Sequence, residues 1–177
     1  MRHHRVPTPL CERPLDAFYF AFFALHAVAS MCVDIQGLVP ASWVPHVFRA
    51  VLQDYLVKSG DPLVPNAWYP RYMWFRVSMF SEFLLQVPTF VLGLWALWRD
   101  DKRVYPLLIA YGAVASFTTL QCIATVVGGE ERIALTDAHL MFLLANYIPF
   151  AAVPLLILVD TSVRTTRLLA QTREKSE

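Results

Sequence analysis

Two carboxylates, Asp34 and Glu82, are the first candidates for chemistry because each lies in or beside a long apolar stretch. A charge within a bilayer is costly, so an acidic residue in a spanning segment usually faces the interior of a helix bundle, where it binds a ligand or pairs with another residue. Glu82 lies well inside its apolar stretch. Asp34 lies at the end of its own, where an Asp is ordinarily solvated. The alternative for Glu82 is a structural carboxyl, protonated and hydrogen-bonded to a neighbouring helix.

Further polar side chains recur at helical spacing. Ser78, Glu82 and Gln86 repeat every four residues and form one polar stripe among Phe, Leu and Val. A later helix has a second polar face, which we expect to point inward: Thr118, Gln121, Cys122 and Thr125. Hydroxyls in membrane helices often bond only their own backbone, so this face predicts either ligand contacts or contacts between helices.

Other classes of function have little support in the sequence. The lone His26, in the middle of the first apolar stretch, favours a hydrogen bond between helices over a metal ligand, because no His, Cys or Glu spacing completes a metal site. Phosphate-binding loops, nucleophile elbows and Cys-x-x-Cys pairs are absent. The net charge of +1, with scattered cations, gives no reason to expect nucleic acid. We therefore expect no metal, no cofactor and no catalytic residue.

Four apolar stretches are long enough to hold these residues within a bilayer. A hydrocarbon core about 30 Å thick needs ~20 mostly apolar helical residues. The chain is 56% hydrophobic and 16% charged, and we expect spans at 15–36, 73–98, 104–127 and 139–160. Pro88 and Pro149 interrupt two of them, which membrane helices tolerate when neighbours satisfy the freed carbonyls. The predicted fold is an all-α membrane protein, a four-transmembrane-helix bundle over residues 15–161.

The cations are divided unequally between the two sides of this bundle. Short cytoplasmic loops collect Lys and Arg. The richer side comprises the tails 1–14 and 162–177 and the second loop: Arg2, Arg5, Arg13, Arg99, Lys102, Arg103, Arg164, Arg167, Arg173 and Lys175. The other side has Arg49, Lys58, Arg71, Arg76 and Arg132. We therefore expect both tails in the cytoplasm.

The first loop contains an amphipathic helix at about 43–58. Its apolar positions follow helical spacing: Val44, Val47, Phe48, Val51, Leu52, Tyr55 and Leu56. Arg49, Gln53, Asp54 and Lys58 occupy the opposite side. A helix of this kind lies in the membrane interface or caps a cavity between spans.

Together these features resemble the sigma-2 receptor family, within the wider group that shares the emopamil-binding (EXPERA) domain. The resemblance covers nearly the whole chain. It rests on Asp34-Ile35-Gln36 followed by Val39-Pro40, on Phe48-Arg49 followed by Tyr55 and Asp61-Pro62-Leu63, on Glu82 with Gln86 and Pro88, and on Tyr147 with Pro149 and Pro154.

The resemblance implies an endoplasmic reticulum membrane protein, often a homodimer, whose helices enclose a hydrophobic cavity for sterols or oxysterols and lipophilic cationic amines. In that family the residue matching Asp34 pairs with the amine, and the one matching Glu82 hydrogen-bonds to it. The other expected ligand-binding residues are His26, Met31 or Val33, Gln86, Thr118 or Thr119, Tyr147 and Phe150, the last replacing a second tyrosine of the family. Asp61, Pro88 and Pro149 are expected to be structural.

Two alternatives to a receptor stay open. Related emopamil-binding enzymes isomerise sterols in the same kind of pocket, using an acid that protonates a ring double bond. This chain lacks a His at i+4 from Glu82 in the second span, and it has four predicted spans where the isomerases resemble a five-span design. The third possibility is a membrane scaffold or chaperone in protein biogenesis. The basic retrieval signal of some relatives is absent from the C-terminal sequence.

Overall fold

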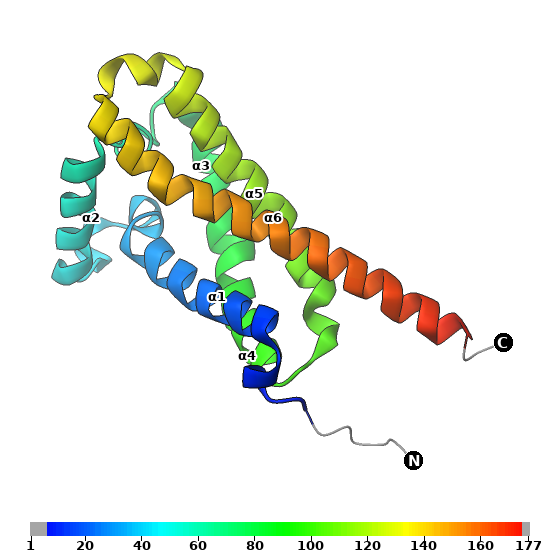
Figure 1. Ribbon diagram of the computed structural model, residues 1–177. Helices are drawn as coiled ribbons and strands as arrows, with labels where there is room; N and C mark the ends of the chain where they lie inside the picture. Colours follow the sequence, from blue (N-terminus) through cyan, green and yellow to red (C-terminus); the bar gives the residue numbers. More distant parts are fainter. Residues whose placement is uncertain (1–6, 175–177) are drawn as a thin grey trace.

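The computed structural model describes residues 7–174, which form helices joined by short turns, with no strand in that range. Four helical segments are long and apolar enough to cross a membrane: Pro14–Cys32, Pro70–Trp98, Lys102–Gly128 and Asp137–Glu174. They pack against one another as a bundle (Figure 1). The expected all-α, four-span fold is confirmed.

The first span ends in a turn that contains Asp34. The 3₁₀ turn η1 (Leu10–Glu12) precedes α1 (Pro14–Cys32), whose first residue is a proline, a position where a missing N–H leaves no hydrogen bond unmade. The chain then turns at Asp34 and continues in the 3₁₀ segments η2 (Ile35–Leu38) and η3 (Ala41–Trp43). Asp34 is thus placed by a turn, although we expected helix to residue 36.

The second span is interrupted at Glu82. It consists of η4 (Pro70–Tyr72), α3 (Met73–Ser81), the π-helical turn η5 (Glu82–Gln86) and α4 (Val87–Trp98). Pro88 has no N–H to continue the α-helical pattern, and the Val87 N–H bonds the Glu82 carbonyl five residues back. Such π turns are frequent at functional sites, and this one carries both Glu82 and Gln86.

The third and fourth spans lie side by side (Figure 1). After η6 (Lys102–Val104), α5 (Tyr105–Gly128) approaches α6 (Asp137–Glu174) closely at Gly112, where a Cβ would lie 2.6 Å from the Pro154 carbonyl oxygen. Small residues permit such close contacts in membranes. The turn η7 (Glu130–Ala134) joins the two helices. Because α6 continues to Glu174, residues 162–174, which we expected as a tail, are helical and project from the bundle (Figure 1).

The amphipathic loop helix α2 (His46–Ser59) lies at the opposite end of the bundle from the start of α1 (Figure 1). It contacts α1 and α6. Gly60 ends it with a φ of 59°, the left-handed conformation that glycine adopts without a Cβ penalty. The chain then reverses toward Asp61.

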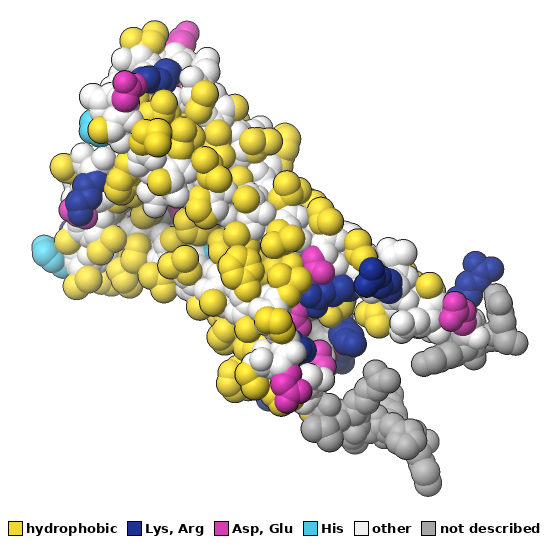
Figure 2. Space-filling view, viewed as in Figure 1, with side chains coloured by type: hydrophobic (Ala, Val, Ile, Leu, Met, Phe, Trp, Pro, Cys, Tyr) yellow, Lys and Arg dark blue, Asp and Glu magenta, His cyan; other side chains and the backbone are white. Residues whose placement is uncertain are grey.

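The outer surface of the spans is largely apolar. Between 17% and 33% of the most hydrophobic window of each span is buried within the chain, and Figure 2 shows hydrophobic side chains over much of one face of the molecule. Monomeric soluble proteins rarely expose apolar patches beyond a few hundred Å². Lipid therefore covers this surface.

Candidate functional site

A cavity of about 160 Å³ lies inside the bundle, bordered by two packed apolar clusters. One cluster, around Tyr19, Phe23 and Phe90, fills the end where α1 begins, and the other, around Leu63 and Phe75, fills the end near α2. The cavity is lined by His26, Ala29, Val33, Asp34, Tyr55, Asp61, Val64, Phe75, Ser78, Met79, Glu82, Gln86, Thr118, Thr119, Cys122, Asn146, Tyr147 and Phe150.

Asp34 and Glu82 meet on the wall of this cavity. Their carboxyl groups are within hydrogen-bonding contact, and the Ser30 hydroxyl donates to Glu82 Oε1. Ser30 is fully buried and lies one helical turn before Asp34. The end of α1 and the π turn of the second span thereby bring together two acids that are distant in sequence.

A third carboxylate, Asp61, reaches the cavity from the loop after α2. It is 4% exposed and accepts hydrogen bonds from the hydroxyls of Tyr55 (2.7 Å) and Tyr147 (2.8 Å) and from the Leu63 N–H (2.7 Å). Burial and the nearby Asp61 carboxylate raise the pKa of Tyr55, so this hydroxyl keeps its proton and remains a donor. Asp61 thus ties α2 to the fourth span and orients Tyr147.

His26 lies on α1 one turn before Ser30. Its Nδ1 is 2.8 Å from the Tyr111 hydroxyl on α5, and its ring packs against Phe90 and Phe150, with ring centroids 4.7 and 4.6 Å away. This contact is the hydrogen bond between helices that we weighed against a metal ligand. No group of three or more His, Cys, Asp or Glu side chains within residues 7–174 is arranged to hold a metal ion.

The remaining polar groups on the cavity wall differ in how much of their hydrogen-bonding capacity is already used within the protein. Gln86 is buried. The hydroxyls of Thr118 and Thr119 donate to carbonyls of their own helix, at 3.0 Å to Val114 and 2.9 Å to Ala115, so their oxygens can only accept from a ligand. Of the polar face predicted on this helix, Cys122 also lines the cavity, whereas Gln121 and Thr125 do not.

Met31 is a predicted ligand-binding residue that the structure places outside the cavity. Its side chain is 46% exposed on the outer side of α1. Successive helical residues are rotated by ~100°, so Met31 cannot follow Ser30 toward the interior. Val33, the alternative, does line the cavity.

The cavity wall combines acids with hydroxyl groups and one imidazole, that of His26. Among the residues that the structure describes, no Lys or Arg lines it. Sequence reasoning missed the cavity-facing hydroxyl of Tyr55 and the support of Glu82 by Ser30. The spacing of His26, Ser30 and Asp34, four residues apart, carried a signal for Ser30.

Comparison with known proteins shows relatives over most of the chain. A family model described as EXPERA (EXPanded EBP superfamily) matches residues 47–161. Sigma intracellular receptor 2 of Xenopus tropicalis is 29% identical over 156 residues, 85% of this chain and 89% of the relative. The Homo sapiens protein of that name is 23% identical over 162 residues, with the same shares. Efficient mitochondria targeting-associated protein 19 of Saccharomyces cerevisiae is 28% identical over 116 residues, 62% of this chain and 70% of the relative.

Proposed function

The chain belongs to the EXPERA family, and on that premise we propose that it is a sigma-2-receptor-like membrane protein that binds sterols and lipophilic cationic amines in the cavity of Asp34 and Glu82. The observation that carries this proposal is a pair of touching carboxyls on the wall of a largely apolar cavity within a four-span bundle.

The amine specificity follows from the charge of the cavity. Two touching carboxyls cannot both ionise cheaply at low dielectric, so they share a proton and together carry one net negative charge. No Lys or Arg from the described residues reaches the cavity to balance that charge. A ligand ammonium supplies the missing cation, while walls such as Val33, Val64 and Phe75 contact the apolar carbons next to it. The same pair can hydrogen-bond a sterol hydroxyl.

We propose binding without turnover. The curated relatives compared above are named as receptors or for mitochondrial targeting rather than as enzymes. An isomerase is the second candidate, because His26 lies on the cavity wall with the two acids. The His26 ring, however, is held by Phe90, Phe150 and the Tyr111 hydroxyl, and general acid–base catalysis needs a group positioned against a second ring carbon. The name of the yeast relative supports a further, scaffold-like alternative in protein biogenesis.

The proposed setting is the endoplasmic reticulum membrane, with a homodimer as the assembly and both termini in the cytoplasm. In support of this orientation, α1 begins and α6 ends at one end of the bundle, the end to which the richer set of cations belongs. A protease added to sealed microsomes should then remove tags from both tails. Protection of either tag contradicts the orientation.

Mass spectrometry of lipids that copurify with the full chain in neutral detergent tests occupancy of the cavity. We expect a sterol in the wild type and roughly tenfold less in Glu82→Leu, since a lost buried hydrogen-bond partner costs ~1–3 kcal/mol. Glu130→Leu is the matched control, because Glu130 is exposed outside the cavity. Unchanged thermal unfolding shows that the variants are folded. Sterol retained at the wild-type level in folded Glu82→Leu contradicts the proposal.

A further inference from the structure

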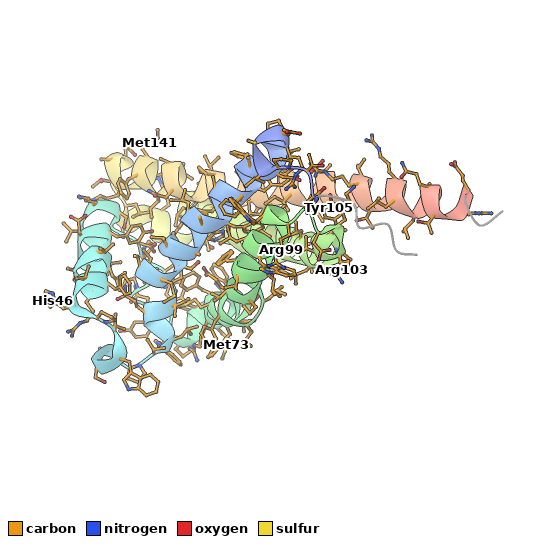
Figure 3. The ribbon with its side chains drawn as sticks, turned by 90° about the horizontal axis from the view of Figure 1, so that it is seen from below. His46, Met73, Arg99, Arg103, Tyr105 and Met141 are labelled. Atoms are coloured by element: carbon orange, nitrogen blue, oxygen red, sulfur yellow. The ribbon has the colours of Figure 1, made fainter. Side chains whose placement is uncertain are left out.

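A second pocket, the cationic pocket, lies at the end of the bundle where α6 projects. It has a volume of about 500 Å³ and is lined by four basic residues, Arg13, Lys102, Arg164 and Arg167. Figure 2 shows Lys and Arg side chains gathered where α6 leaves the bundle, and Figure 3 shows Tyr105, another lining residue, at the same place. The apolar cluster around Tyr19 and Phe23 fills this end of the bundle, and the two pockets share no lining residue.

Two of the four basic residues are held in place by acids. Asp16, which is almost fully buried, accepts a hydrogen bond from Arg13 on one oxygen and from Arg164, at 2.6 Å, on the other. Arg164 also pairs with Asp160 at 2.8 Å, and Arg13 lies 3.6 Å from Asp100. These acids are therefore engaged, and they fix the walls contributed by α1 and α6.

The other two basic residues have no such partner. Lys102, from the connection between the second and third spans, and Arg167, from α6, are both exposed and line the same pocket. Within residues 7–174 neither forms an ion pair or a side-chain hydrogen bond. Two uncompensated cations at one pocket attract an anion.

Arg13, Asp100 and Lys102 of this pocket lie at the ends of candidate membrane spans, so a bilayer around those spans would put the pocket near the lipid headgroups. Trp98, at the end of the second span, is 66% exposed, as is typical of the aromatic belt at a membrane interface. Leu15 and Leu168 line the pocket beside the cations. Basic pockets between membrane helices bind phosphate-bearing headgroups, and apolar walls suit the adjoining glycerol and acyl carbons.

We propose that the cationic pocket binds the phosphate group of an anionic phospholipid, with Lys102 and Arg167 as the charge contacts. Arg13 and Arg164, fixed by Asp16, form its rigid back wall. The site is independent of sterol or amine binding in the cavity of Asp34 and Glu82. A bound phospholipid would contact both the projecting part of α6 and the connection between the second and third spans.

The test uses the purified full chain in neutral detergent with three probes: dioctanoyl phosphatidic acid, dioctanoyl phosphatidylcholine and inorganic phosphate. Native mass spectrometry and thermal shift report binding. We expect phosphatidic acid to bind at least tenfold more tightly than phosphatidylcholine. The double variant Lys102→Gln/Arg167→Gln should weaken phosphatidic acid binding roughly 10- to 30-fold, since each cation near an anionic surface contributes roughly a fivefold change in affinity.

The matched control, Arg49→Gln/Lys58→Gln, removes the same charge from α2 at the other end of the bundle. We expect it to change phosphatidic acid binding less than about threefold. If inorganic phosphate competes at the same concentration as phosphatidic acid, the pocket binds free phosphate rather than a phospholipid, and the proposal is contradicted. Equal losses in the two double variants, or phosphatidic acid no tighter than phosphatidylcholine, overturn the proposal.

Discussion

Two aspartates at opposite ends of the first span have contrasting surroundings. Asp16, in the first turn of α1, is buried between Arg13 and Arg164. Asp34, just beyond the end of α1, contacts the carboxyl of Glu82 and lines a cavity that no Lys or Arg of the described range reaches. Burial of an acid thus does not by itself indicate a ligand site. The proposed ligand site rests on the missing counter-charge together with the contact between Asp34 and Glu82 on the cavity wall.

The contrast also separates stability from function. Removing one member of a buried, compensated ion pair leaves the others uncompensated and is strongly destabilising. An uncompensated acid pair has already incurred its desolvation cost, so neutralising it need not weaken the fold. Functional sites often lower the stability of a protein in this way.

The largest stability difference should therefore lie between the same substitution at these two positions. Asp16→Asn leaves Arg13 and Arg164 without their shared acid and should destabilise the protein by ~3 kcal/mol, a fall in Tm of about 6–12 °C. Asp34→Asn should leave Tm unchanged or raise it. Thermal unfolding of both variants in detergent checks this, and a larger loss for Asp34→Asn reverses the assignment of structural and ligand-binding roles.

A smaller effect is expected at Glu131, another buried acid, in the loop between the third and fourth spans. Burial acts to raise its pKa, but hydrogen bonds from its backbone and from Tyr72 and Arg71 outweigh burial, so the pKa of Glu131 lies below its ordinary value. Its stabilisation is therefore present above the unfolded-state pKa and is lost as pH falls through the lower folded-state pKa.

Acidification from pH 7 to about pH 3.5 should consequently lower Tm more in the wild type than in Glu131→Gln, by about 2–4 °C. The exposed neighbour offers the control Glu130→Gln, which should behave as the wild type. An identical pH dependence in the wild type and Glu131→Gln would show that this acid does not stabilise the fold.

The smallest effect is expected for catalysis, because we predict that the protein does not turn over a sterol. Expressed in a strain that lacks its own Δ8–Δ7 sterol isomerase, the chain should produce no isomerised sterol, since His26 is held by aromatic rings and Tyr111. Sterol profiling provides the measurement. Isomerised sterol that disappears again in Glu82→Gln would establish an enzyme in place of a receptor.

The fold could largely be predicted because bilayer thickness fixes how long an apolar helix must be. The places where the helices are interrupted or end could not be predicted in the same way. Pro88 indicated a disturbed helix, but the π turn at Glu82 also depends on the packing of neighbouring side chains, which the sequence pattern does not reveal. Similarly, Asp160 and Arg164 suggested the end of the fourth span, whereas they pair with each other and the helix continues to Glu174.

A cavity-facing position could be predicted where a residue lay well inside a span or matched the resemblance. The structure brings His26, Asp34, Glu82 and Tyr147 to one cavity. Met31 does not join them, since its position relative to the cavity depends on helix rotation. Tyr55 was expected on the apolar face of α2 and in the family resemblance but not in the cavity, and its bond to Asp61 depends on the reversal at Gly60. Contacts made across turns are not encoded in periodicity.

The most direct test of an uncompensated carboxyl pair is the binding of two ligands that differ by one charge. A 3-hydroxysterol and the 3-dimethylamino analogue of the same ring system would be titrated against wild type, Asp34→Asn and the exposed control Asp54→Asn. Asp34→Asn should weaken the amine by ~2–5 kcal/mol, at least roughly 30-fold, and the sterol less than about threefold. Asp54→Asn should change neither. Equal losses of both ligands in Asp34→Asn would show that Asp34 supports the cavity rather than pairing with the cation.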